Sequence, residues 1–229
     1  MDNILTSLDN KPNANPMRIP RHALPSLALC AIALNLASGK TQPNPASDSL
    51  KLDSSHKGFR LSKGGKPLFH YLAKPSSESV KYAPHYSRNG YIHPLFSPSG
   101  KIVTGDYASD HPHQHGLFFA WTKSTFRGKP TEFWNQAKKL GDIRFHRYLG
   151  EERRKESCSF LFEQIFTTGK DSDEPILKET WRIDVPGKPM PYHQFDLVST
   201  QTCATKDSLL IQKYHYGGMA IRGNPQWMK

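Results

Sequence analysis

Long apolar runs are absent from this sequence after residue 39, so no later segment predicts a membrane-spanning helix. The glycine patterns that hold phosphates or dinucleotides, and the Gly-x-Ser-x-Gly turn of serine hydrolases, are absent as well. There is no repeat of fixed period and no convincing amphipathic helix. We therefore expect no nucleotide cofactor and no integral membrane association of the mature protein.

Cysteine is scarce, with three in 229 residues. Cys30 lies in an apolar N-terminal run, which leaves Cys158 and Cys203 for the folded domain. A disulfide needs α-carbons within about 7 Å of each other. Under the strand assignment given below, the two cysteines fall at opposite ends of two strands that run parallel. We therefore expect two free thiols.

The charge is strongly positive, with 31 Lys and Arg against 20 Asp and Glu and a net charge of +11. The basic residues are scattered along the chain, apart from short clusters such as Arg153-Arg154-Lys155. There is no arginine-rich arm and no nucleic-acid motif. This pattern disfavours a nucleic-acid partner and favours an anionic small molecule or glycan. The sequence carries no signal for the oligomeric state.

The N-terminus has the features of a signal peptide over residues 1–39. Arg18 and Arg21 precede an apolar run at residues 24–36, and Ala37, Ser38 and Gly39 supply small residues for cleavage. Met17 is a candidate for the true start, and an uncleaved anchor is the alternative. Residues 40–57 are rich in Pro, Ser and Asn and are expected to form a flexible linker. The mature protein is then exported, either periplasmic or secreted.

The remainder, residues 58–229, reads as short strands separated by turns, helped by 18 Pro and 16 Gly in the whole chain. The clearest strand covers residues 179–185, where Trp181, Ile183 and Val185 alternate with polar residues. With residues 158–168 and 193–203 it predicts an antiparallel meander. Residues 209–216 predict a further strand, which ends at Gly217-Gly218. The fold class is all-β, an antiparallel β-sandwich.

The most informative motif is Asp-His-Pro-His-Gln-His-Gly at residues 110–116. If this segment is extended, His111, His113 and His115 project to the same side. Three imidazoles on one side are typical of a catalytic metal site with an open position, and they also suit acid–base work near neutral pH. Asp110 would orient a ligating imidazole from behind. The alternative is an exposed turn containing Pro112.

A second group of candidates is aromatic. Tyr214-His215-Tyr216-Gly217-Gly218-Met219 predicts a strand edge with a tight turn, or the wall of a binding site. Its rings, together with Trp121 and Trp134, would stack on a sugar, and Asn135 would add hydrogen bonds. Each of these residues is also a candidate for the core.

Four motifs carry a resemblance to a known family. They are Ser-Arg-Asn-Gly-Tyr-Ile-His-Pro-Leu-Phe-Ser-Pro-Ser-Gly at residues 87–100, the histidine motif, Phe133-Trp134-Asn135 and residues 214–219, in this order. The chain resembles the exported bacterial proteins called PmoA-like, or "methane oxygenase PmoA", over residues 58–229. Members similar to this chain continue beyond the Gly-Gly-Met motif, so a C-terminal truncation with missing late strands is expected. Methane oxidation in a membrane is not expected, because the chain reads as β-structure.

The resemblance implies work on carbohydrate. The first hypothesis is an exported hydrolase, lyase or epimerase on a large sandwich of the galactose-mutarotase type. His111, His113, His115 and His215 would be catalytic: either the first three bind one divalent ion, Zn, Cu or Fe, or the histidines act as acid and base without a metal. The substrate-binding candidates are Trp121, Trp134, Asn135, Tyr214, Tyr216 and Arg222. The alternatives are a non-catalytic glycan-binding module, a structural or degenerate fragment, and a metal-dependent oxidase or oxygenase.

Overall fold

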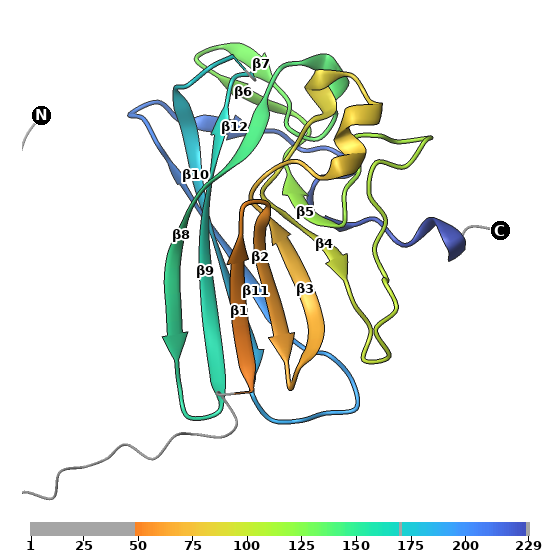
Figure 1. Cartoon of the computed structure of the whole chain (residues 1–229). Coiled ribbons are helices and arrows are strands. Elements are labelled where there is room, and N and C mark those ends of the chain that lie inside the picture. The colour runs from red at the N-terminus through yellow and green to blue at the C-terminus, as the bar shows by residue number, and fades with distance from the viewer. Residues whose placement is uncertain (1–48, 170, 228–229) are drawn as a thin grey trace, which may run out of the picture. The chain divides into compact units, whose positions relative to one another are not determined.

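The computed structural model describes residues 49–169 and 171–227, and these residues form an all-β fold (Figure 1). The expected signal peptide over residues 1–39, and the linker as far as residue 48, lie outside the described residues. The chain divides into two units between Thr41 and Gln42, and every described residue belongs to the second unit. Among the described residues, no helix is long and apolar enough to cross a membrane.

One sheet has six strands in the order β1-β2-β3-β4-β5-β13, and all neighbours are antiparallel. Its strands are β1 (Leu50–Ser55), β2 (Gly58–Lys63), β3 (Lys66–Leu72), β4 (Tyr91–Leu95), β5 (Leu117–Ala120) and β13 (Gly218–Ile221). Gly64 and Gly65 form the turn that joins β2 to β3, and both glycines have positive φ. The predicted linker over residues 40–57 is wrong where β1 lies, because Leu50 packs into the core and is 2% exposed. The folded domain therefore begins before Gly58.

The second sheet has four antiparallel strands in the order β11-β10-β9-β8. They are β8 (Asp142–Arg153), β9 (Ser157–Thr167), β10 (Pro175–Pro186) and β11 (Asp196–Cys203). This confirms the predicted meander. Cys158 pairs with Val185 and Cys203 pairs with Leu177, roughly 26 Å apart along β10. Both cysteines are free, as predicted, and burial raises the pKa of the Cys158 thiol to about 11.

A third, three-stranded sheet lies at one end of the molecule (Figure 1) and has the order β12-β6-β7. Its strands are β6 (Ser124–Phe126), β7 (Lys129–Thr131) and β12 (Leu209–Ile211). Short 3-10 helices complete the described chain, η1 (Ser77–Lys81), η2 (Pro84–Tyr86), η3 (Gln136–Lys138) and η4 (Pro225–Trp227). The predicted strand over residues 209–216 is wrong beyond Ile211, because the chain leaves the sheet there and turns through Gly217 and Gly218, which have φ of +139° and +90°.

Two groups of apolar side chains form the core. The first fills the space between the six-stranded and four-stranded sheets, where Tyr71 stacks on Phe162 with ring centroids 4.1 Å apart. Trp181 lies edge-on to Tyr71 and is fully buried. The second group includes Phe118 and Phe133 and reaches the three-stranded sheet through Phe126 and Leu209. The alternation of Trp181, Ile183 and Val185 was therefore a sound indicator of the buried face.

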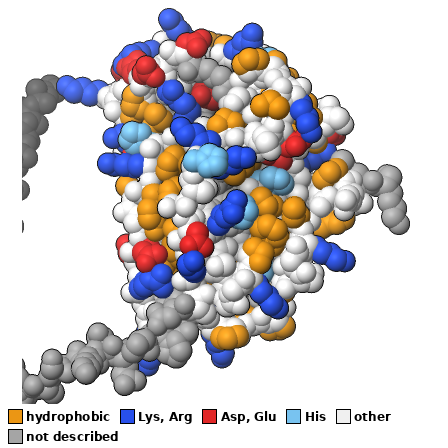
Figure 2. Space-filling view, in the orientation of Figure 1, with side chains coloured by type: hydrophobic (Ala, Val, Ile, Leu, Met, Phe, Trp, Pro, Cys, Tyr) orange, Lys and Arg blue, Asp and Glu red, His pale blue; other side chains and the backbone are white. Residues whose placement is uncertain are grey.

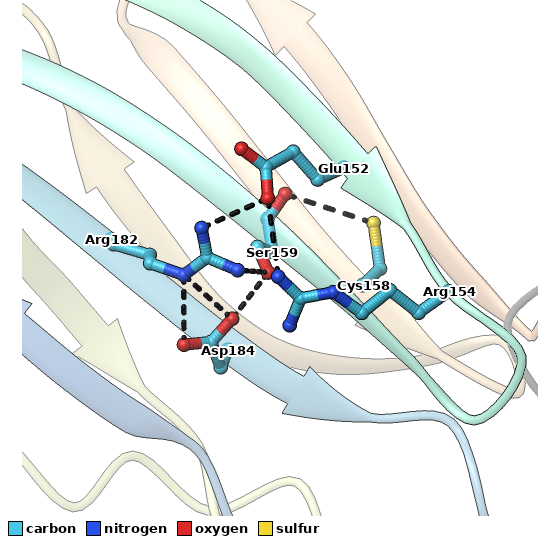
Figure 3. A network of polar contacts seen from close by, with 6 residues as sticks. All are labelled: Glu152, Arg154, Cys158, Ser159, Arg182 and Asp184. Carbon is cyan, nitrogen blue, oxygen red and sulfur yellow. Dashed lines mark hydrogen bonds and ion pairs between the residues drawn. The ribbon is translucent and has the colours of Figure 1, made fainter. Parts of the chain in front are cut away.

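The outer face of the four-stranded sheet carries a polar network (Figure 3). The guanidinium of Arg182 donates to both carboxylate oxygens of Asp184, each at 3.1 Å, to Ser159 Oγ at 2.6 Å and to Glu152 at 2.9 Å. Burial raises the pKa of Asp184, but the hydrogen bonds from Arg182 and Ser159 outweigh it and the net shift is downward. These bonds join β8, β9 and β10 and fix their register. The network is a structural feature of a solvent-facing sheet.

Candidate functional site

The histidine motif at residues 110–116 is a turn and not a strand. The backbone N–H of His111 donates to the carbonyl of Ala108 at 3.0 Å, and that of Gln114 donates to the carbonyl of His111 at 2.9 Å. Successive side chains therefore do not alternate between two faces. The prediction that three imidazoles project to one side is wrong, because the turn sends His115 inward and leaves His111 exposed.

His115 belongs to a buried polar network. The side chains of His115 and Asp106 are 0% and 2% exposed, and Nδ1 of His115 lies 2.8 Å from Oδ1 of Asp106. The other oxygen of Asp106 accepts hydrogen bonds from Ser76 Oγ at 2.8 Å and from Tyr91 OH at 2.9 Å. A carboxylate only accepts, so Nδ1 carries a proton. Burial lowers the pKa of His115.

The second ring nitrogen of His115 is also occupied. Its Nε2 lies 3.3 Å from Oε1 of Gln136, and the ring is enclosed by the rings of Tyr91 and Tyr107, with both centroids 4.7 Å away. Because Nδ1 is bonded to Asp106 and the ring is enclosed, His115 holds the 106–116 segment in place. This arrangement gives it a structural role and not the catalytic role predicted from the motif.

Gly116 sets the path of this segment past β4. A Cβ at this position would lie 2.0 Å from the carbonyl oxygen of Ile92 and 2.8 Å from Cβ of His93, so a larger residue does not fit. The close approach brings His93 beside the histidine motif, a neighbour that the sequence did not predict. His93 is held by its Nδ1, which lies 2.9 Å from Oγ1 of Thr104.

Asp110, His111, His113 and Arg222 form a second group, here called the histidine surface. Oδ2 of Asp110 lies 2.8 Å from Nδ1 of His111, and Oδ1 accepts from Arg222 at 2.9 Å. The same guanidinium donates to Gln114 at 2.9 Å. Burial, followed by the nearby His111, lowers the pKa of His113 to about 4. Arg222 thus orders the loop, and His113 is neutral at pH 7.

The described residues do not fit the predicted metal site. Within residues 49–169 and 171–227, no three or more His, Cys, Asp or Glu side chains form a group that could hold a metal ion. His111 and His113 face each other with ring centroids 5.6 Å apart, but His115 is directed into the core. Asp110, expected to orient a ligand from behind, pairs with His111 and Arg222 at the surface.

The predicted aromatic residues do gather around a cleft, here called the aromatic cleft. Its volume is about 320 Å³, and it is lined by Trp121, Thr122, Lys123, Ile211, Gln212, Lys213, Tyr214, His215, Tyr216 and Gly217. The ring centroids of Tyr214 and Tyr216 are 4.9 Å apart, and that of His215 is 4.7 Å from Tyr216. Tyr214 and Tyr216 are 45% and 43% exposed. The cleft therefore presents aromatic faces to solvent.

Hydrogen bonds of the two residues that follow β5 fix the wall of this cleft. Thr122 Oγ1 donates to the carbonyl of Tyr216 at 2.8 Å, and the indole N–H of Trp121 donates to Gln201 at 2.8 Å. Trp134 packs behind the wall, with its ring centroid 5.2 Å from that of Tyr216, and is 9% exposed. Trp134 supports the cleft and does not line it, which corrects its predicted role as a direct contact.

A smaller hollow of about 270 Å³ adjoins the aromatic cleft, and the two share Thr122, Lys123 and Tyr214. It is also lined by Glu132 and Lys138, which form an ion pair. Asn135 lines neither hollow. Its side chain accepts from the N–H of Ala137 at 3.1 Å, so Asn135 caps η3. The structure thus gives Asn135 a capping role, and its substrate contact stays a prediction.

The aromatic cleft and the histidine surface lie at opposite ends of the β5–β13 pair. The N–H of Arg222, after β13, donates to the carbonyl of Gly116, before β5, at 2.8 Å. Tyr216, before β13, is bonded to Thr122, after β5. A four-residue strand spans roughly 13 Å. His215 accordingly lies with the aromatic residues, and the single site predicted from the sequence is two separate places.

A further hollow, of about 610 Å³, is lined by Pro84, His85, Gln136, Lys139, Gly141, Thr168, Gly169, Asp171 and Ser172. Of its lining residues, Gln136 contacts the buried network, with Oε1 3.3 Å from Nε2 of His115. Its lining has no tyrosine or tryptophan, so it offers no aromatic face to a sugar ring. We assign it no function.

Several of these residues were not predicted. Asp106 and Gln136 contact His115 from nine and 21 positions away, and no spacing rule links them to the motif. Lys123 and Glu132 enter the hollows only because β6 and β7 fold back beside the loop at residues 212–217. Such long-range contacts leave no signal in a single sequence.

The face shown in Figure 2 has Lys and Arg side chains spread over it, with acidic side chains and histidines among them.

The fold and the cleft define an all-β protein with an aromatic-lined hollow at the junction of two sheets. The chain belongs to DUF6807, a family of unknown function, whose model matches residues 59–229. No curated protein and no solved structure matches the chain. The family description names no activity, so the PmoA-like resemblance stays a prediction.

Proposed function

We propose that this protein binds a saccharide in the aromatic cleft and acts as an exported glycan-binding protein. The observation that supports this most is the cleft itself, where half-exposed tyrosine rings stand beside hydrogen-bonding side chains. Tyrosine and tryptophan offer apolar faces to the C–H groups of a sugar ring and polar tips to its hydroxyls. Gln212, Thr122 and His215 supply further polar groups in the same wall.

The size of the cleft agrees with a small ligand. A volume of about 320 Å³ is near the lower end of ligand sites in proteins, which favours one ring or a short segment of a chain. The adjoining hollow at Glu132 and Lys138 extends the surface for a neighbouring ring. The predicted signal peptide supports export, where glycans are met outside the cytoplasm.

Calorimetric titration of the full chain with neutral and acidic oligosaccharides tests the proposal. We expect saturable heat at one site per chain for at least one oligosaccharide, with an affinity in the range of about 1 mM to 1 μM. Saccharide binding is expected without a change of fold, because the cleft is already formed in the structure. Absence of saturable heat for every neutral and every acidic member of the panel, from a folded sample, contradicts the proposal.

The second candidate function is acid–base catalysis at the histidine surface. Its support is His113, which is half-buried and neutral at pH 7, beside the Asp110–His111 pair and Arg222. A neutral imidazole is able to accept a proton from a sugar substrate. Because roughly 13 Å separates this surface from the aromatic cleft, one sugar ring does not contact both. Binding is therefore the better supported function.

A further inference from the structure

Two lysines of the aromatic cleft have no acidic partner among the described residues. Lys123 and Lys213 both line the cleft and both are exposed. Lys138 differs from them, because Glu132 holds its ammonium group. The only acidic side chain in the adjoining hollow is thus already paired with a lysine. The cleft therefore carries two positive charges beside its aromatic wall.

The backbone fixes the position of both lysines. Lys123 directly precedes β6 and Lys213 lies two residues after β12, at the end where Ser124 pairs with Ile211. The N–H of Gln212 donates to the carbonyl of Lys123 at 2.9 Å, so the two chain segments stay side by side. Gln212 is also held by its side-chain N–H, which donates to Thr125 at 2.9 Å. The backbone from which the two lysine side chains extend is therefore held in place by hydrogen bonds, and this edge of the cleft is here called the rim.

We propose that the aromatic cleft selects saccharides with an acidic substituent, and that Lys123 and Lys213 bind this group. This inference rests on the proposed function. Both lysines line the same cleft as Tyr214 and Tyr216, so a ring stacked on either tyrosine shares that cleft with the two ammonium groups. An ammonium group is a compact point charge whose N–H groups have no fixed orientation, so it can bind either a carboxylate or a sulfate. The net charge of +11 adds a general attraction for such ligands.

The test compares trigalacturonate, a sulfated trisaccharide and neutral galactotriose by calorimetry with the full chain. We expect both acidic ligands to bind about tenfold more tightly than the neutral one at about 50 mM NaCl, and this preference to shrink at about 300 mM. The double variant Lys123→Gln/Lys213→Gln loses about tenfold in affinity for acidic ligands and keeps its affinity for galactotriose. A difference between the two acidic ligands identifies which anion the cleft prefers.

The matched control is Lys101→Gln/Lys178→Gln, which removes the same net charge from exposed positions outside the cleft. We expect it to bind all three ligands like the unmodified chain. Equal affinity for neutral and acidic trisaccharides, unchanged in the cleft double variant, overturns the acidic preference and leaves the saccharide site standing. If both double variants weaken acidic binding equally, general charge and not the two rim lysines is responsible. If none of the three ligands binds and no other member of the neutral and acidic panel gives saturable heat, the proposed function itself fails.

Discussion

His115→Ala lowers the free energy of unfolding by about 3–5 kcal/mol, because it leaves the buried carboxylate of Asp106 short of one hydrogen bond and removes a large buried ring. The carboxylate of Asp106 keeps its bonds from Ser76 and Tyr91 but loses the imidazole. Gln136 loses its contact as well, and a cavity opens between the rings of Tyr91 and Tyr107. Urea denaturation followed by tryptophan fluorescence measures the change.

The pH dependence of this loss has a definite sign. Burial holds the pKa of His115 below its ordinary value of 6.5 in the folded state, so the unfolded chain binds the proton more readily. The contribution of His115 is fully present above pH 6.5 and is lost as the pH falls below that value. The gap between the unmodified chain and His115→Ala is therefore smaller at about pH 5 than at about pH 7.5.

His111→Ala is the control for His115→Ala. Its side chain is 49% exposed, so we expect little change in the free energy of unfolding. Equal losses of stability for the two variants, or a loss in neither, contradicts the structural role given to His115. The comparison also separates this role from the predicted metal site, in which both histidines would be equivalent ligands.

Tyr216→Ala weakens saccharide binding by about tenfold or more, because an aromatic anchor at the centre of a site contributes about 1.4 kcal/mol or more. Tyr216 contacts Tyr214, His215 and Trp134, so its ring is the centre of the aromatic wall. Tyr216→Phe keeps the stacking face and loses only the hydroxyl. We expect Tyr216→Phe to stay close to the unmodified affinity in the same calorimetric titration.

Tyr192→Ala is the control for Tyr216→Ala. Tyr192 is 54% exposed and lines a different hollow, beside Lys63 and Met190. Its loss removes an exposed tyrosine without touching the aromatic cleft, and the affinity should not change. Retention of full affinity in Tyr216→Ala, from a folded sample, excludes the aromatic wall as the binding surface.

Strands with regular alternation could be predicted from the sequence, and short or irregular ones could not. Residues 179–185 show a period of two that matches the buried face of β10, because the core group around Trp181 faces one side of that strand. β1 was missed because Pro, Ser and Asn dominate the preceding residues, and only Leu50 and Leu52 show its period. Residues 212–216 alternate without a partner strand, so they form the wall of a cleft.

The sequence correctly predicted which aromatic residues meet at the candidate site. Its prediction for the geometry of the histidine motif was wrong. The aromatic residues do meet, since Trp121, Tyr214 and Tyr216 line one cleft. The histidine motif does not form one face, because Pro112 and the hydrogen bond from Gln114 to His111 turn the chain. His115 is buried because it pairs with Asp106 in the interior. A single sequence does not show which of the three histidines has such a buried partner.

The most direct test of the account is a map of backbone amide chemical shifts in the ¹⁵N-labelled chain during titration with an oligosaccharide that gives saturable heat. The account predicts that the largest shifts occur at Thr122, Lys123, Tyr216 and Gly217, which line the aromatic cleft. The amides of Asp110, His113 and Gly116 should remain unchanged. Largest shifts in the histidine motif, with residues 121–123 and 212–217 unaffected, would contradict the central claim that the aromatic cleft is the binding site.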